Sequence, residues 1–154
     1  ESQAFGTATF GEKGFLYAEV VVGERSLPLI NLHLNFRSRS IRRRQIGQVI
    51  DYIKIKSHPT ELATPLAPII CGDFNCPLRY EQDAVASMFE YILTHGDYHL
   101  YPKKAGTFPA HLPARLPRRI IDFIFVPAFL HVEHTEVLRS YLSDHRPVVV
   151  DVII

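Results

Sequence analysis

Polar side chains that could take part in catalysis stand at the ends of apolar runs in this sequence. The run Leu29–His33 ends in a histidine, and the run Ile69–Asn75 ends in a carboxylate and an amide two residues apart. Asp122 lies inside a third apolar run, and the polar cluster Ser143–His145 comes just before the final one. An apolar strand that carries polar residues at its end is a common rigid scaffold for a functional site.

Together these side chains supply the parts that hydrolysis of a phosphoester needs. A phosphate is anionic and repels nucleophiles, so a hard cation such as Mg²⁺ must neutralise charge, and carboxylate and amide oxygens suit that cation. A histidine can donate a hydrogen bond to phosphate or accept a proton from water when an acidic neighbour fixes its tautomer. The candidate residues are His33, Asp73, Asn75, Asp122, Asp144 and His145.

Each of these signals, taken alone, favours a structural role. A single Asp in a strand, or a single His after one, more often serves the fold than catalysis. The segment Gly72–Asn75 could also be a simple turn, because Gly, Asp and Asn all favour turns. Their joint occurrence at several strand ends favours a functional site.

The elements that must position these residues can be read from the hydrophobic pattern. Apolar runs rich in β-forming residues predict strands, the first two joined as a hairpin, over residues 15–22, 27–34, 68–73, 120–126 and 147–154. Apolar residues at helical spacing predict helices over about Ser40–Lys56 and Glu81–Leu93, ending near His58 and Gly96. Residues 64–68 and the proline-containing stretch 98–117 are expected to be loops. Several strands are apolar on both faces, so we expect an α+β fold of packed sheets with helices outside.

Bulk composition narrows the class of protein. The chain has 154 residues, with 47% hydrophobic and 21% charged residues and a net charge of +1, so no global field points to a nucleic-acid or membrane partner. No apolar run has the length of a transmembrane segment. Cys71 and Cys76 flank a tight segment and do not resemble a disulfide framework, which slightly favours a reducing, cytoplasmic compartment.

The sequence resembles the endonuclease/exonuclease/phosphatase superfamily, whose fold is the DNase I-like one. Four stretches in the family's order carry the resemblance, which covers most of the chain from about Lys13: residues 31–34, 72–75, 119–125 and 143–148. The resemblance implies a single domain over residues 1–154, built as a four-layer α/β sandwich with two packed β-sheets flanked by helices. It also implies a hydrolase of phosphoester bonds that depends on Mg²⁺ or Mn²⁺.

The resemblance further implies a role for each candidate residue. Asp73 and Asn75 would contact the scissile phosphate, the attacking water or a metal, and Asp144 would be a metal ligand. Asp122 would orient His145, which would contact or protonate the phosphate, in an arrangement that raises the pKa of an imidazole. His33 would be the second active-site histidine. The resemblance does not identify the substrate, which could be a nucleic acid, a phospholipid headgroup or a small phosphoester.

One part of the family's pattern has no counterpart here. Members open with a strand that ends in Asn, followed by a Gln-Glu segment whose Glu is the principal metal ligand, and residues 1–12 supply neither. We therefore expect the C-terminal part of a longer domain that lacks its N-terminal strands and metal-binding Glu, with low activity on its own. The alternative is an inactive fragment or non-catalytic binding module that retains the fold. The upstream coding sequence would discriminate between them.

Five arginines crowd the start of the first predicted helix, within residues 37–44. Arginines near a helix N-terminus oppose the helix dipole, which favours the presence of an anionic partner. One interpretation is a phosphate-facing patch in which Arg42 and Arg43 bind the substrate. The other is a solvated helix face.

Overall fold

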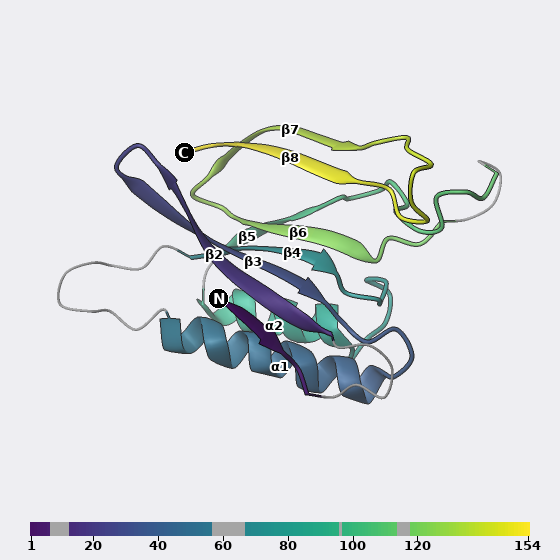
Figure 1. Cartoon of the computed structure of the whole chain (residues 1–154), viewed down its shortest axis with the longest axis horizontal. Coiled ribbons are helices and arrows are strands. Elements are labelled where there is room, and N and C mark those ends of the chain that lie inside the picture. The colour runs from purple at the N-terminus through teal and green to yellow at the C-terminus, as the bar shows by residue number, and fades with distance from the viewer. Residues whose placement is uncertain (7–12, 57–66, 96, 114–117) are drawn as a thin grey trace.

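The computed structural model describes residues 1–6, 13–56, 67–95, 97–113 and 118–154. Within these residues the chain forms two β-sheets and two helices, which confirms the expected α+β fold (Figure 1). The helices are α1 (Arg39–Lys56) and α2 (Ala84–His95). A six-stranded sheet has the order β1 (Ser2–Ala4), β2 (Gly14–Val22), β3 (Arg25–His33), β4 (Ile69–Asp73), β6 (Asp122–Pro127) and β5 (Tyr98–Tyr101). The second sheet pairs β7 (His131–Val137) with β8 (Val148–Ile153).

Strand pairing within the six-stranded sheet brings the ends of three strands to one place. Strands β2 and β3 form the predicted hairpin, and β3 pairs in parallel with β4, so that His33 is aligned with Asp73. Strand β6 is antiparallel to β4, and the pairing aligns Asp122 with Asp73. The last residues of β3 and β4 and the first residue of β6 therefore lie side by side.

The two faces of the six-stranded sheet are covered differently. Both helices pack on one face, where fully buried residues of the strands, such as Ile30, Ile70 and Phe125, meet Val49 and Met88 of the helices. On the other face a smaller cluster around Leu27, Ile69 and Val126 packs against apolar residues of β7 and β8. Figure 1 shows this order of layers, with α1 and α2 below the sheet and β7 and β8 above it.

The start of α2 is set by a buried aspartate. The helix begins three residues later than predicted, because Asp83 caps it: its Oδ1 accepts a hydrogen bond of 2.7 Å from the backbone N–H of Ala84. The Asp83 carbonyl then accepts from the N–H of Ser87 at 3.0 Å. Helix α1 matches its prediction to within one residue.

Three strands were not predicted from the sequence. Strand β1 is short, and β7 is mostly exposed, with a polar sequence that gives no apolar signal. Strand β5 corrects the prediction that residues 98–117 form an irregular loop throughout, because Tyr98–Tyr101 completes the sheet by pairing with β6. Two predicted helix termini, at His58 and Gly96, lie outside the described residues, as does most of the predicted loop at 64–68.

Both cysteines carry free thiols, Cys71 half-buried and Cys76 buried. Burial raises the pKa of each thiol to about 11, so both are protonated at neutral pH. In the described part of the chain, no helix combines the length and the apolar character that crossing a lipid bilayer requires.

Candidate active site

Asp73 is fixed by the segment that follows it. The backbone N–H of Asn75 donates to Asp73 Oδ1 at 2.8 Å, and Asn75 Nδ2 donates to Asp73 Oδ2 at 2.9 Å. Asn75 Nδ2 also donates to the Leu34 carbonyl at 2.9 Å, which ties the segment to the end of β3. Asn75 has a φ of 52°, a left-handed conformation that Asn adopts more readily than most residues. The side chain of Phe74 is fully buried between these two residues and anchors them in the core.

The residue before Asp73 has to be a glycine. Gly72 has a φ of 132°, and a Cβ at this position would collide with the carbonyl oxygen of Leu32 in the neighbouring strand. The close approach of β3 and β4 at this point therefore depends on the missing side chain. It places the Asp73 carboxylate beside His33, whose Nε2 lies 3.4 Å from Asp73 Oδ2.

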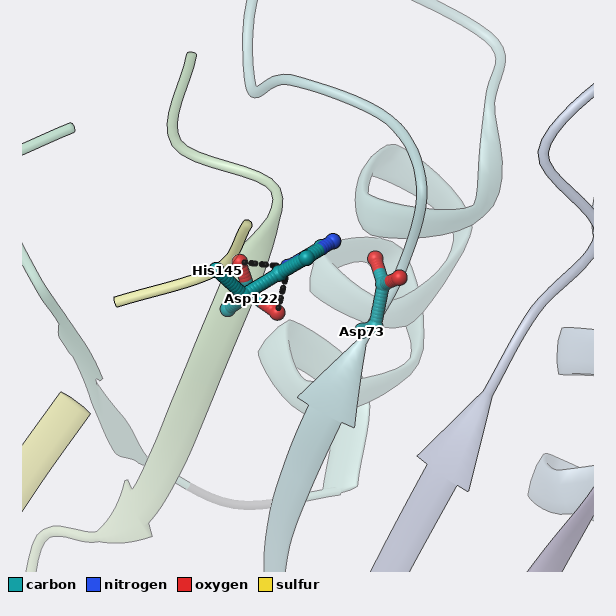
Figure 2. Close-up of side chains that lie close together, drawn as sticks. All are labelled: Asp73, Asp122 and His145. Atoms are coloured by element: carbon teal, nitrogen blue, oxygen red, sulfur yellow. Dashed lines mark hydrogen bonds and ion pairs between the residues drawn. The ribbon is translucent and has the colours of Figure 1, made fainter. Parts of the chain in front are cut away.

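Asp122 and His145 form a close pair. His145 Nδ1 lies 3.0 Å from each of the two carboxylate oxygens of Asp122, so the pair fixes the tautomer in which Nδ1 carries the proton. The far end of the imidazole is directed towards Asp73 (Figure 2). The His145 ring also packs against Phe108 at a centroid distance of 4.8 Å, which holds it from a second side. This is the contact that the sequence predicted for Asp122 and His145.

The electrostatic surroundings raise the pKa of Asp73 to about 6. Burial is the main cause, and the nearby Asp122 carboxylate adds to it. The hydrogen bond from Asn75 and the charges of His145 and Lys13 act in the opposite direction. The carboxyl group of Asp73 therefore titrates close to neutral pH, where a group can both take up and release a proton.

The surroundings of His33 favour the neutral form of its imidazole. Burial is the main cause of the lowered pKa of its imidazole, and the positive charge of Lys13 adds to it. Lys13 Nζ lies 2.7 Å from His33 Nε2. Sequence reasoning did not single out Lys13, because one lysine before a strand carries no pattern.

The site offers ligands for a divalent cation. One ligand atom from each of Asp73, Asp122 and His145 can be chosen so that all three lie within 4.8 Å of one another. The two carboxylates suit a hard cation such as Mg²⁺ or Mn²⁺, whereas an imidazole is a more usual ligand of Zn²⁺ and other transition metals. The Asp144 carboxylate does not belong to this group. It is exposed and accepts a hydrogen bond of 3.3 Å from the Ser143 hydroxyl.

One of the two arginines interpreted as substrate-binding is already engaged within the fold. Arg42 is buried, and its guanidinium donates from Nε to Asp83 Oδ1 at 2.9 Å, from Nη2 to Asp83 Oδ2, and from Nη1 to the Asn35 carbonyl at 3.1 Å. This corrects the interpretation of Arg42 as a substrate-binding residue, because its donors already bind α2 and the loop before α1. Arg43 is exposed on the helix surface. A run of arginines does not reveal which member will be buried.

Comparison with known proteins relates both sequence and fold to one family. The model of the endonuclease/exonuclease/phosphatase family matches residues 9–145. A search of curated protein sequences gives no match.

Solved structures match over nearly the whole chain. A mannosyl-6-phosphatase of Bacteroides thetaiotaomicron matches with a TM-score of 0.72 and 20% identity, over 93% of this chain and 58% of that one. A family protein of Bacteroides vulgatus gives 0.64 and 22%, over 94% and 57%. A variant of beta toxin from Staphylococcus aureus with bound magnesium ions gives 0.58 and 18%, over 88% and 56%. The chain thus spans little more than half the length of these structures, which share its fold.

Proposed function

The chain belongs to the endonuclease/exonuclease/phosphatase family, and from this premise we propose that its site hydrolyses a phosphoester bond with the help of Mg²⁺ or Mn²⁺. The observation that carries the proposal is the Asp122–His145 pair, with Nδ1 at 3.0 Å from both carboxylate oxygens, placed beside the Asp73 carboxyl group. Two proteins of similar fold, a mannosyl-6-phosphatase and a beta toxin with bound magnesium ions, support this proposal.

His145 is proposed to contact the phosphoryl group through Nε2. Asp122 holds the proton on Nδ1, so Nε2 accepts a proton from water when the ring is neutral and donates a hydrogen bond to a phosphate oxygen when the ring is protonated. This is the arrangement in which a carboxylate orients a catalytic imidazole.

Asp73 is proposed to exchange a proton with the attacking water or the leaving group. In the cation-free site its pKa of about 6 would let it act as base or acid near neutral pH, and a cation bound to its carboxylate would lower this pKa. The two hydrogen bonds from Asn75 keep its carboxylate in one orientation, so Asn75 acts as its positioning residue. His33, 3.4 Å from Asp73, is proposed to hold the other side of the phosphate site.

A divalent cation fits the residues that are present. The carboxylates of Asp73 and Asp122 would hold it, and we propose Asp144 as a further ligand from the exposed side, which leaves Nε2 of His145 for the phosphoryl group. When bound, the cation would neutralise the negative charge of the phosphoryl group. The two carboxylates would otherwise repel an anionic substrate, which is why we expect hydrolysis to require the cation.

The test is hydrolysis of p-nitrophenyl phosphate and bis(p-nitrophenyl) phosphate by the purified chain, with Mg²⁺, with Mn²⁺ and with EDTA. We expect cation-dependent release of nitrophenol that falls by about 10²-fold or more in His145→Asn, because general acid–base catalysis contributes rates of that order. His99→Asn, on an exposed residue of β5, is the matched control and should keep the native rate. Equal rates for the two variants would contradict the proposed role of His145, and a rate unaffected by EDTA would contradict the role of the cation.

A further inference from the structure

Lys13 lies at the mouth of a pocket next to the candidate site. Its backbone is fixed because the Lys13 carbonyl accepts a hydrogen bond of 2.8 Å from the N–H of Phe5, beside β1. Its ammonium reaches across to His33, with Nζ at 2.7 Å from Nε2 and 3.2 Å from Nδ1. The same His33 nitrogen, Nε2, lies 3.4 Å from Asp73 Oδ2, so the ammonium stands next to the proposed phosphate site.

The partner of this ammonium does not neutralise it. Among the described residues, the ion pairs of the chain do not include Lys13, whose close contact is with the imidazole of His33, a group that cannot compensate a positive charge. An imidazole nitrogen can accept one N–H of an ammonium and leave the other two N–H groups able to donate. The lysine is therefore held in place and still able to bind an anion.

The pocket beside Lys13 has room for a ligand. Its volume is about 500 Å³, and it lies over the surface of the paired strands β1, β2 and β3. Polar groups of Gln3, Asn31 and His33 line it together with the Asp73 carboxyl group and the apolar side chain of Leu16. A cation on the wall of a mixed polar and apolar pocket suits an anionic head joined to a larger organic group.

We propose that Lys13 binds a non-bridging oxygen of the substrate's phosphoryl group and that this pocket receives the remainder of the phosphoester. This inference rests on the proposed function, because only an enzyme has a substrate to bind. Anion binding by Lys13 can nevertheless be measured without turnover. In the sheet, His33 and Lys13 lie on one side of Asp73 and Asp122 lies on the other, so the ammonium adds a positive charge to the side of the site away from the Asp122–His145 pair.

The probe is inorganic phosphate, titrated into the full chain at constant ionic strength and followed by calorimetry, in EDTA and in Mg²⁺. We expect the Kd for phosphate to rise about tenfold or more in Lys13→Gln, because a hydrogen bond to a charged group is lost. Lys13→Arg should keep the Kd within about threefold of the native value. Lys104→Gln, which removes an exposed lysine far along the chain, should leave it unchanged and controls for net charge.

The outcomes separate this inference from the proposed function. Unchanged phosphate affinity in Lys13→Gln, an equal loss in Lys104→Gln, or no phosphate binding by the native chain would overturn the role of Lys13. A native chain that binds phosphate through Lys13 but hydrolyses neither nitrophenyl ester supports the inference and contradicts the proposed function. Where both hold, Lys13→Gln should raise KM more than it lowers kcat. If Lys13→Gln does not fold, Lys13→Met keeps the aliphatic stem and is read in the same way.

Discussion

Asp73 is the residue at which the fold and the proposed chemistry conflict. Its carboxyl group is largely buried, it lies near a second carboxylate, and its pKa is raised to about 6 from an ordinary 3.8. A carboxyl group that is easier to ionise in the unfolded chain destabilises the folded state once it is charged. The residue that suits proton transfer near neutral pH is therefore one that weakens the fold.

Asp73→Asn should stabilise the chain above pH 6. The folded pKa lies above the unfolded one, so native stability falls as pH rises from about 4 to 6 and stays reduced above it. One pKa unit corresponds to about 1.4 kcal/mol, and allowing for weakened hydrogen bonds from Asn75 we expect a gain of about 1 kcal/mol at pH 8. The gain should vanish near pH 4. Urea unfolding in EDTA measures this gain in stability, and Asp151→Asn, at an exposed residue of β8, is the control.

At the scale of elements, the close contact between β3 and β4 depends on one glycine. Gly72→Ala places a methyl group against the Leu32 carbonyl and forces a side chain into a φ of 132°, so we expect a loss of more than about 3 kcal/mol in the free energy of unfolding. Gly47→Ala is the matched control, because a Cβ there meets nothing within 4 Å. In the middle of α1 it should stabilise by up to about 1 kcal/mol. Similar effects of the two substitutions on urea midpoints would contradict this explanation.

The helices are joined by the buried ion pair of Arg42 and Asp83. Arg42→Met removes the nearest cation from a fully buried carboxylate and leaves Arg39 Nε at 3.9 Å, so the free energy of unfolding should fall by about 3–5 kcal/mol. The double variant with Asp83→Asn should recover part of this loss, because Asn keeps the cap of α2 without the charge. Exposed Arg43→Met should stay within about 0.5 kcal/mol of the native chain. A double variant no more stable than Arg42→Met would show that the buried charge is not the cause.

At the scale of the whole molecule, a bound cation should stabilise the fold. A ligand that binds only the folded chain adds about 1.4 kcal/mol at ten times its Kd, so Mg²⁺ or Mn²⁺ should raise Tm by a few degrees and EDTA should reverse the change. Asp73→Asn should abolish the rise, while Asp51→Asn on the exposed face of α1 should keep it. Asp144→Asn tests the proposed additional ligand. A Tm that does not respond to either cation would contradict the metal site.

The sequence predicted the parts of the fold that carry a periodic signal. The hairpin, both helices and the strands that end at Asp73 and begin at Asp122 were found because burial selects apolar residues at fixed spacing. Strand β7 was missed because its exposed side chains follow no such selection, and β5 because four residues beside a proline resemble a loop.

The candidate site was predicted in the same uneven way. The Asp122–His145 contact followed from a resemblance to known motifs, whereas the burial of Arg42 and the approach of Lys13 to His33 depend on three-dimensional packing. Neither can be read from residue type or spacing. In both cases the sequence does not show which residue lies next to the side chain in the folded protein.

The register that aligns His33 with Asp73, and Asp73 with Asp122, bears on how this chain can change in evolution. Successive side chains on a strand alternate between faces, so inserting or deleting one residue inside β4 would turn the helix-facing residues outward and misalign both neighbours of Asp73 at once. Substitutions can accumulate on the exposed surfaces, but changes in length have to be confined to the loops. Chains of different length that keep this chemistry should therefore share these three strand lengths and differ in the segments between them.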